Sequence, residues 1–407
     1  MVMERHYGMD WLRIGAFALL IVYHVGMVFV PWGFHVKTEH PLVWAEIPMF
    51  LTSPWRLTLL FVVSGYASRA LIGKMPGIGA FLRQRSGRLL WPLLFGMAVV
   101  VPPQTWVELT TQHGYTSGYL HFWLTDYFRF GTLAGIVMPT WNHLWFVAYL
   151  WVYTLVVAGV AALPVGARAQ AWFDRAFGGW RALVLPALYL VLLEAVVFHR
   201  IDDTHDLFRD GVAHLRYLPA FAFGFGLAGS RPVMAALARH WKAAAVVAIG
   251  CYATLAGLLI AWPDFSFPGD ASVLAYRLAR HGEAWPAIAA LIGIAETFWN
   301  RDSAWRPMLT EAVFPFYIIH QTVIVVVGYA IIGRGIAPGA EFAILLAATV
   351  AGCWAFYLIG REIGWLRPLI GLRVAKARAS ATPRGDGRLD PADPRWRRDS
   401  RAREDCA

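Results

Sequence analysis

The stretch RIGAFALLIVYH places two ionisable side chains at the ends of an apolar run, Arg13 first and His24 last. Ionisable residues at membrane depth are costly and commonly mark functional sites. An imidazole accepts a proton near neutral pH, so His24 has the chemistry of a general base acting on a hydroxyl group. The alternatives are an interhelical hydrogen-bonding role for His24 and an interfacial anchoring role for Arg13.

Helical geometry brings these groups to one face of the first predicted helix. An eleven-residue step is three turns plus about 20°, and about 16 Å of rise, so Arg13 and His24 share a face. Asp10 lies one turn before Arg13, on the same side of the helix. We therefore expect a line of ionisable groups running from the cytoplasmic membrane edge to about the middle of the bilayer.

A second histidine is predicted at a similar depth in EAVFPFYIIHQT. His320 lies about eleven residues from the cytoplasmic end of its helix, and Tyr317 lies one turn earlier on nearly the same face. Either side chain can orient a substrate or His24. Packing with a satisfied hydrogen bond is the alternative for both.

The loop and helix start FLRQRSGRLLWP brings Arg83, Arg85 and Arg88 together, where guanidinium groups can bind phosphates bidentately. The alternative is that these arginines only mark the cytoplasmic side of the membrane. In LLFVVSGYASR we expect Ser64 and Gly65 to permit close helix packing. A nucleophilic Ser64 lacks the GxSxG context.

Composition places the chain among polytopic membrane proteins. It has 407 residues, 58% of them hydrophobic and 15% charged, with a mean hydropathy of +0.50, whereas soluble domains are about 25% charged. Its three cysteines have no zinc or disulfide spacing, so we predict neither a metal nor a bound cofactor. The net charge of +10 reflects a basic C-terminal end, which indicates membrane topology rather than nucleic-acid binding.

Ten apolar runs predict an all-α protein with about ten transmembrane helices. The runs are 11–33, 47–70, 89–107, 143–163, 182–199, 213–229, 243–262, 283–299, 309–332 and 341–360. A cytoplasmic N-terminus puts 27 Lys and Arg on the cytoplasmic side and nine on the other, so both termini are predicted to be cytoplasmic. We predict a transmembrane domain over 1–374 and a disordered basic tail over 375–407.

Two further patterns are interpreted as coincidental. One is the GxGxxG pattern of Gly224, Gly226 and Gly229. No strand is predicted before it, and a dinucleotide-binding motif requires one, so we do not predict dinucleotide binding. His205 and Asp210 form an HxxxxD pattern like that of soluble glycerolipid acyltransferases, on the side of the membrane predicted to lack cytosolic thioesters.

Five stretches together resemble the acyltransferase-3 family of integral membrane O-acyltransferases. They are DWLRIGAFALLIVYH, FVVSGYASR, RQRSGRLLWP, HLWFVAYL and FPFYIIHQTV, in the family's order over 10 to about 325. The resemblance implies a cytosolic acyl-CoA donor, a glycan hydroxyl acceptor on the outer side, and essential residues at Arg13 and His24. HLWFVAYL lacks the acidic residue of the O-antigen acetylases, and the chain is most similar to the glucan-biosynthesis subgroup associated with succinylating periplasmic glucans.

The resulting hypothesis is an O-acyltransferase of the bacterial inner membrane, with succinyl favoured over acetyl. His24 acts as general base or is transiently acylated, and Asp10 and Arg13 shape the donor end. The predicted substrate-binding residues are Arg85, Arg88, Ser64, Tyr317 and His320. The alternatives are a transporter or proton-coupled channel using Glu194 and Glu296, and a non-catalytic scaffold for glycan-synthesis machinery.

Overall fold

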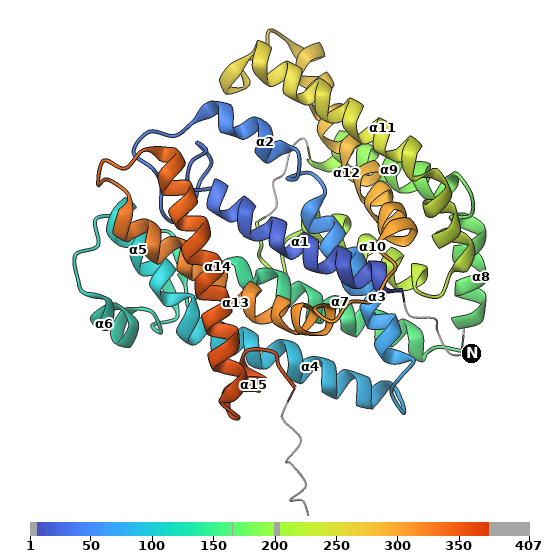
Figure 1. The fold of residues 1–407 in the computed structure, drawn as a ribbon, viewed down its shortest axis with the longest axis horizontal. Coiled ribbons are helices and arrows are strands. Elements are labelled where there is room, and N and C mark those ends of the chain that lie inside the picture. Colours follow the sequence, from blue (N-terminus) through green and yellow to red (C-terminus); the bar gives the residue numbers. More distant parts are fainter. Residues whose placement is uncertain (1–5, 165, 199–203, 374–407) are drawn as a thin grey trace, which may run out of the picture. The chain divides into compact units, whose positions relative to one another are not determined.

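The computed structural model describes residues 6–164, 166–198 and 204–373 (Figure 1). The predicted tail, 375–407, lies outside the described residues. The longer helices are α1 (Tyr7–Gly26), α3 (Arg56–Ile72), α4 (Ile78–Phe95), α5 (Pro102–Gln112), α7 (Trp145–Ala162), α8 (Gly166–Ala176), α9 (Arg181–Leu193), α10 (Gly211–Leu227), α11 (Arg231–Ala261), α12 (Asp270–Phe298), α13 (Arg306–Ile331) and α14 (Pro338–Glu362).

Shorter elements connect these helices. They are η1 (Val43–Ala45), α2 (Glu46–Phe50), η2 (Gly96–Val100), α6 (Tyr119–His121), η3 (Phe122–Asp126), β1 (Gly131–Leu133), β2 (Ile136–Met138), η4 (Asn142–Leu144), η5 (Glu194–Phe198), η6 (Pro263–Phe265) and α15 (Leu366–Leu369). The strands β1 and β2 pair antiparallel, Gly131 opposite Met138. Their two-residue turn, Ala134 and Gly135, has positive φ at both positions, as a type I′ hairpin requires.

Six helical segments among the described residues are long and apolar enough to cross a membrane. They are Tyr7–Gly26, Ile78–Gln112, Asn142–Ala162, Arg231–Ala261, Arg306–Ile331 and Pro338–Glu362. A seventh is possible if α8 and the following segment, Arg181–Val197, form one span, although they meet at 89°. The chain is therefore a polytopic, predominantly α-helical membrane protein.

Each of the ten predicted apolar runs falls on a helix, but the boundaries differ in places. The run 11–33 was too long: α1 ends at Gly26, and the loop after it is itself apolar, with Val28, Phe29 and Val30 buried. The run 47–70 is interrupted, since turns over 51–55 separate α2 from α3 around Pro54, which has no backbone N–H to donate. Hydropathy does not distinguish a buried apolar loop from a helix.

Not every one of these helices satisfies the length and composition expected of a membrane span. Helices α3 and α10 have 17 residues each, and α12 carries Arg277, Arg280 and Glu283 within its length. The predicted total of ten crossings therefore stays a prediction.

Helices α3 and α10 approach each other through two glycines. A Cβ on Gly65 would lie 1.9 Å from the carbonyl oxygen of Phe221, and a Cβ on Gly224 would lie 1.9 Å from that of Val62. Small residues allow such backbone contact between membrane helices. The predicted packing role of Gly65 is confirmed, and Gly224 of the GxGxxG pattern is a helix-packing residue.

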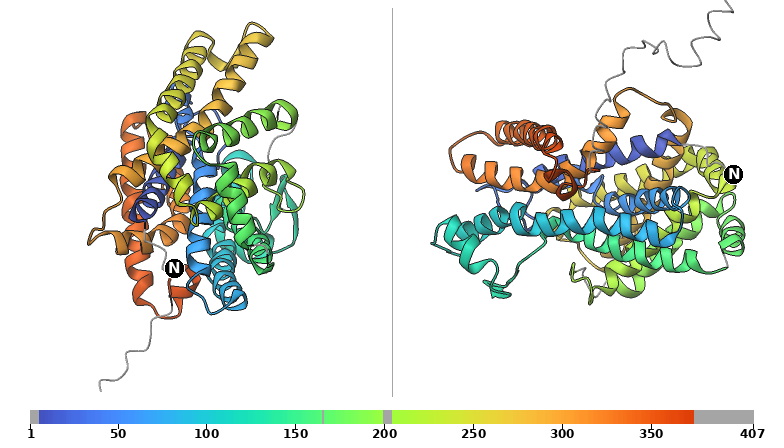
Figure 2. Two further views of the ribbon diagram at one scale, coloured as in Figure 1. Left: turned by 90° about the vertical axis from the view of Figure 1, so that its right-hand side faces the viewer. Right: turned by 90° about the horizontal axis from the view of Figure 1, so that it is seen from below.

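Helix α1 occupies a central position in the helix bundle and packs against α3, α12 and α13 (Figure 1). Helix α4 runs beside α7 (Figure 2). Apolar residues of these helices, including Leu12, Phe61 and Ile288, form one continuous core. Polar side chains on α1 are therefore surrounded by protein on several sides.

We expect Gly65→Ala to destabilise the protein by about 1–3 kcal/mol or more, because the added methyl group collides with backbone rather than with a movable side chain. The matched control is Gly15→Ala on α1, where nothing lies within 4 Å of the added Cβ; it should be neutral or stabilising, since alanine favours a helix over glycine. Thermal unfolding in detergent measures both. Equal melting temperatures for the two variants would contradict the close contact.

Candidate active site

His24 and His320 meet at the centre of the bundle. His24 lies in the last turn of α1, and His320 lies near the middle of α13 and is fully buried. Nε2 of His320 is 3.1 Å from Nδ1 of His24, and the ring centroids are 5.0 Å apart. The predicted association of these two histidines is therefore present.

Backbone carbonyl groups determine which nitrogens of this pair carry protons. Nδ1–H of His320 donates to the carbonyl oxygen of Tyr317 at 2.7 Å, so Nε2 of His320 carries a lone pair. Nδ1–H of His24 is then shared between that lone pair and the carbonyl oxygen of Leu20, 3.0 Å away. Nε2 of His24 is left as a proton acceptor, and no hydrogen-bond partner for it occurs among the described residues. This is the state that a general base needs.

A third imidazole, His143, adjoins the pair and was not predicted. It belongs to η4, at the start of the HLWFVAYL stretch, and its ring centroid lies 5.2 Å from that of His320. Nε2–H of His143 donates to the carbonyl oxygen of Ile318 at 3.0 Å, while its buried Nδ1 has no partner among the described residues. The hydroxyl of Tyr317 donates to the carbonyl oxygen of His143, so Tyr317 positions His143 rather than contacting His24.

A buried arginine also lies near His24. Arg56, the first residue of α3, is 4% exposed, and its guanidinium carbon lies 3.3 Å from the ring centroid of Tyr23. Arg56 is within electrostatic reach of His24. Its sequence context alone does not single it out, since it is one of the nine Lys and Arg residues predicted on the outer side. Its burial depends on how α3 packs against α1, which residue spacing does not reveal.

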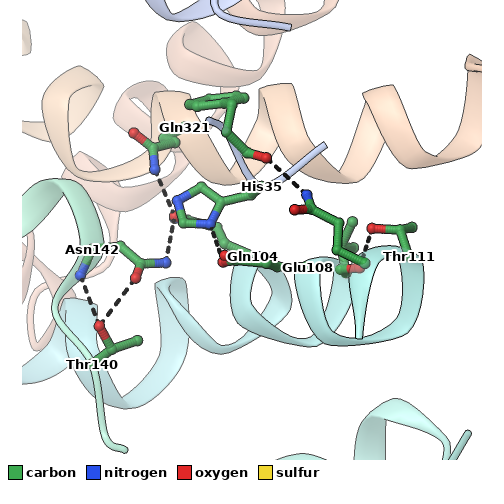
Figure 3. Close-up of polar contacts among 10 residues, drawn as sticks. His35, Gln104, Glu108, Thr111, Thr140, Asn142 and Gln321 are labelled. Carbon is green, nitrogen blue, oxygen red and sulfur yellow. Dashed lines mark hydrogen bonds and ion pairs between the residues drawn. The ribbon is translucent and has the colours of Figure 1, made fainter. Parts of the chain in front are cut away.

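A polar network extends from the histidines towards α5. Gln104 donates to the hydroxyl of Thr322 at 2.7 Å, and its side-chain oxygen accepts from Asn142 and Gln321, each at 3.1 Å. Figure 3 shows the amides of Asn142 and Gln321 directed towards Gln104. Asn142 and Gln321 are sequence neighbours of His143 and His320, so this network helps to fix the two imidazoles.

A histidine–carboxylate pair lies in the same region. His35 of the loop after α1 is hydrogen-bonded to Glu108 of α5 at 2.5 Å (Figure 3), and His35 is within electrostatic reach of His143. Phe34, beside it, stacks on His24 with ring centroids 6.2 Å apart. This loop therefore covers the His24 end of α1.

Asp10 and Arg13 lie at the opposite end of α1, about 21 Å and 16 Å from His24 along the helix axis. Asp10 forms an ion pair with the buried Arg306 of α13 at 2.8 Å. Nη2 of Arg13 donates to the carbonyl oxygen of Thr310 at 3.2 Å. Neither side chain reaches the imidazole pair. In a reaction at His24, Asp10 and Arg13 could therefore contact only a distant part of an extended substrate.

The predicted arginine cluster gathers at this Asp10 end of α1. Arg85 of α4 is within electrostatic reach of Arg13 and Arg88. The Nε atoms of Arg13 and Arg85 are buried and have no partner among the described residues. Guanidinium groups close to one another are unfavourable unless anions compensate them, and Asp10, within electrostatic reach of Arg13, offsets only part of this charge. The arrangement therefore suits a polyanionic ligand. Arg83, in contrast, is exposed.

The remaining predicted residues have packing or capping contacts. Ser64 is half-buried, and its carbonyl oxygen accepts from the hydroxyl of Ser68 at 2.8 Å. Asp210 of the HxxxxD pattern caps α10 by accepting from the backbone N–H of Ala213 at 2.9 Å. His205 stacks on Trp145 with ring centroids 4.1 Å apart, so His205 and Asp210 have structural roles here.

The two glutamates considered for a transporter are each paired with a histidine. Glu194 lies 2.9 Å from His281, and Glu296 lies 2.9 Å from His6.

A large apolar cavity of about 1010 Å³ lies between α3 and α7 to α10, and its lining contains none of the predicted site residues. Among the described residues, no group of three or more His, Cys, Asp or Glu side chains is arranged to hold a metal ion.

The site thus combines a helical membrane fold with closely packed imidazoles and, at the far end of the same helix, arginines whose Nε atoms are buried and unpaired among the described residues. A family model described as an acyltransferase domain, that of the acyltransferase-3 proteins, matches residues 6–358. The chain belongs to this acyltransferase family, which favours an enzyme over a transporter.

Among curated proteins, the chain is similar to glucans biosynthesis protein C from several strains of Escherichia coli. Those from O1:K1 / APEC, O139:H28 (strain E24377A / ETEC) and O9:H4 (strain HS) are each 28% identical over 153 residues. The matched segment covers 37% of this chain and 37% of each relative. No solved structure matches the chain.

Lys37 provides a pH-dependent test of the loop that covers His24. Its ammonium donates to the carbonyl oxygens of Met27, at 2.7 Å, and Val30, and burial lowers its pKa from 10.5 to about 8. Between pH 8 and 10.5 the unfolded chain binds more protons than the folded one, so stability relative to Lys37→Met should rise with pH in that window. Thermal unfolding in detergent measures this difference. A flat or falling difference would contradict the buried position of Lys37.

Proposed function

We propose that the protein transfers an acyl group from cytosolic acyl-CoA to a hydroxyl of a periplasmic or extracellular glycan, with His24 as general base. The observation that carries this proposal is the surroundings of Nδ1 of His24, which lies 3.0 Å from the carbonyl oxygen of Leu20 and 3.1 Å from Nε2 of His320. These contacts favour a proton on Nδ1 and leave Nε2 to accept one. Family membership supplies the reaction class.

In the proposed step, Nε2 of His24 accepts the proton of the acceptor hydroxyl as its oxygen attacks the thioester carbonyl. The C–O bond forms, the C–S bond breaks, and the imidazolium returns the proton to the departing thiolate of coenzyme A. His320 stabilises the transient positive charge, because its Nε2 lone pair faces Nδ1–H of His24. If His24 is acylated instead, its Nε2 attacks the thioester carbonyl, the C–N bond forms and the C–S bond breaks to release the thiolate of coenzyme A. The acceptor oxygen then attacks the same carbonyl, its proton passes to that thiolate, and the C–N bond breaks to restore the neutral imidazole.

The donor is proposed to lie along α1. Arg13, Arg85 and Arg88 bind the phosphates of acyl-CoA at the Asp10 end. The pantetheine arm spans the roughly 16 Å from Arg13 to His24 and delivers the thioester there. The Asp10–Arg306 ion pair holds α1 against α13 beside the arginines, and Ser64 on the neighbouring α3 lines the donor path.

The acceptor is proposed to approach from the opposite end, where the partly exposed His35–Glu108 pair supplies hydrogen-bonding groups suited to sugar hydroxyls. Tyr317 and His320 line the transfer site between donor and acceptor. This arrangement separates a charged, cytosolic donor from an uncharged, hydroxyl-bearing acceptor.

The proposed topology has ten spans in the bacterial inner membrane, with both termini cytoplasmic. Asp10, Arg13 and His24 contact residues 306, 310 and 320 respectively, so residue numbers rise together along both helices, and α1 and α13 run parallel. Parallel spans require an odd number of crossings between them, and the ten predicted runs place seven there. In this topology the C-terminal tail lies on the cytoplasmic side. A glycan-synthesis partner would bind at the cytoplasmic face or within the membrane.

Succinyl is favoured over acetyl as the transferred group because the relatives are glucans biosynthesis proteins, the subgroup that the sequence resembles. Labelled succinyl-CoA and acetyl-CoA, offered separately to the protein in proteoliposomes with a glucan acceptor, distinguish the two donors.

His24→Ala should lower acyl transfer by about 10²–10⁴-fold, the usual contribution of a general base, without preventing membrane insertion. His113→Ala, an exposed histidine after α5, is the matched control and should retain wild-type activity. Mass spectrometry of cell-envelope glycans from a deletion strain complemented with each variant gives the readout. Wild-type glycan acylation with His24→Ala would rule out this mechanism, and loss of acylation only on deletion would favour a scaffold.

Arg85→Gln should raise KM for acyl-CoA by roughly 10-fold or more, because charge-assisted phosphate contacts are stronger than neutral hydrogen bonds, while kcat changes little. Arg83→Gln, two residues earlier on the same helix but exposed, controls for the lost charge. Initial rates against acyl-CoA concentration in proteoliposomes separate the two parameters. An equal KM for both variants would show that Arg85 contributes only to membrane topology.

A further inference from the structure

Arg56 is a buried cation whose charge no carboxylate balances among the described residues. The side chain is 4% exposed, and its Nε and Nη1 atoms are buried without a hydrogen-bond acceptor there. Its close contact is with the ring of Tyr23, whose centroid lies 3.3 Å from the guanidinium carbon. A cation–π contact offsets part of the cost of burial, but it leaves these two nitrogen atoms without an acceptor.

Unsatisfied buried donors on a permanent cation indicate an anionic ligand. Burying a charge without a partner is strongly unfavourable, and native proteins satisfy most of their buried polar groups. Arginine does not lose its charge at physiological pH, so it cannot avoid this cost by deprotonation. The position of Arg56 is therefore best explained by a negatively charged group that occupies this site during function.

Arg56 lies beside the proposed transfer site. The ring centroid of Tyr23 is 6.0 Å from that of His24, so the guanidinium carbon of Arg56 lies at most about 9.3 Å from the centre of the His24 imidazole. Arg56 is at the His24 end of α1, whereas the arginines proposed to bind coenzyme A are at the Asp10 end. A donor that enters along α1 would direct its acyl group towards Arg56.

We propose that Arg56 binds a carboxylate at the far end of the transferred acyl group, so that the site selects dicarboxylic acyl donors such as succinyl-CoA over acetyl-CoA. This inference rests on the proposed function. In an extended succinyl group the carboxyl carbons are about 4 Å apart, and a charge-assisted hydrogen bond adds about 2.8 Å. That reach fits between a thioester carbonyl near His24 and the guanidinium.

A carboxylate explains Arg56 better than the oxyanion of the transfer reaction does. An oxyanion exists only transiently, whereas Arg56 is buried in the resting protein. A carboxylate on the acyl group is present from donor binding to product release. A neutral acetyl group would leave Nε and Nη1 of Arg56 without an acceptor. Sites built to hydrogen-bond a substrate group discriminate strongly against analogues that lack that group.

The test compares succinyl-CoA and acetyl-CoA with the full-length protein in proteoliposomes containing a neutral glucan acceptor. Arg56→Met should lower kcat/KM for succinyl-CoA by about 100-fold or more while changing that for acetyl-CoA less than about 3-fold. Arg56→Lys, which keeps the charge, should recover part of the succinyl preference. The matched control is Arg280→Met, because the guanidinium carbon of Arg280 also lies near an aromatic ring, 5.6 Å from the ring centroid of Phe50. This variant should leave the preference for succinyl-CoA over acetyl-CoA unchanged.

A second readout does not depend on turnover. Succinyl-CoA should raise the melting temperature of the wild-type protein in detergent more than acetyl-CoA does, and Arg56→Met should remove that difference. Equal loss of both donors' turnover in Arg56→Met would assign Arg56 to the oxyanion and overturn the proposal. The proposal would also be overturned if Arg56→Met kept the wild-type preference for succinyl-CoA over acetyl-CoA. The same holds if the wild-type protein showed that preference only with an acidic acceptor in place of the neutral glucan. If the protein transfers neither donor, the proposed function is wrong. The shifts in melting temperature would still show whether Arg56 binds the carboxylate of succinyl-CoA.

Discussion

The contact between α1 and α13 is the constraint on which the site depends. Three polar interactions join the two helices: the Asp10–Arg306 ion pair at 2.8 Å, the Arg13–Thr310 hydrogen bond at 3.2 Å, and the His24–His320 contact at 3.1 Å. Because the partners occur at nearly constant spacing, the two helices cannot slide by one turn without breaking all three. In an apolar surrounding, each broken contact would leave a buried polar group unsatisfied.

This register also explains how one helix separates two kinds of chemistry. The Asp10 end is rich in arginine, with Arg85 in reach of Arg13 and Arg88, and suits a polyanion. The His24 end has three imidazoles and an amide network, which suit hydroxyl groups and proton transfer. A rigid helix of known rise keeps the two ends about 16 Å apart, so a single long substrate is required to occupy both.

Periodicity and composition predicted the parts of the site that lie within regular helices. The shared face of Arg13 and His24, the position of His320 and the packing role of Gly65 follow from 100° per residue and from the small size of glycine. Arg56, His143 and His35, with its partner Glu108, were missed, because Arg56 and His143 lie at helix starts and His35 lies in a loop whose position is set by tertiary packing. The HLWFVAYL stretch was recognised as a motif, yet nothing in its spacing indicated that His143 would reach His320.

The distribution of unsatisfied groups separates structural from functional charges in this protein. Buried Arg306 is compensated by Asp10 and Asp302, so it stabilises the helix bundle without a ligand. Arg56 is buried, and Arg13, Arg85 and Arg56 each have buried nitrogen atoms that the described part of the chain leaves unpaired, although Asp10 offsets part of the charge of Arg13. Since a bilayer interior offers little water to satisfy such groups, we attribute them to the binding of an anionic substrate. Cations with unpaired nitrogen atoms towards both ends of α1 therefore fit the proposed donor, which would carry charge at its two extremities.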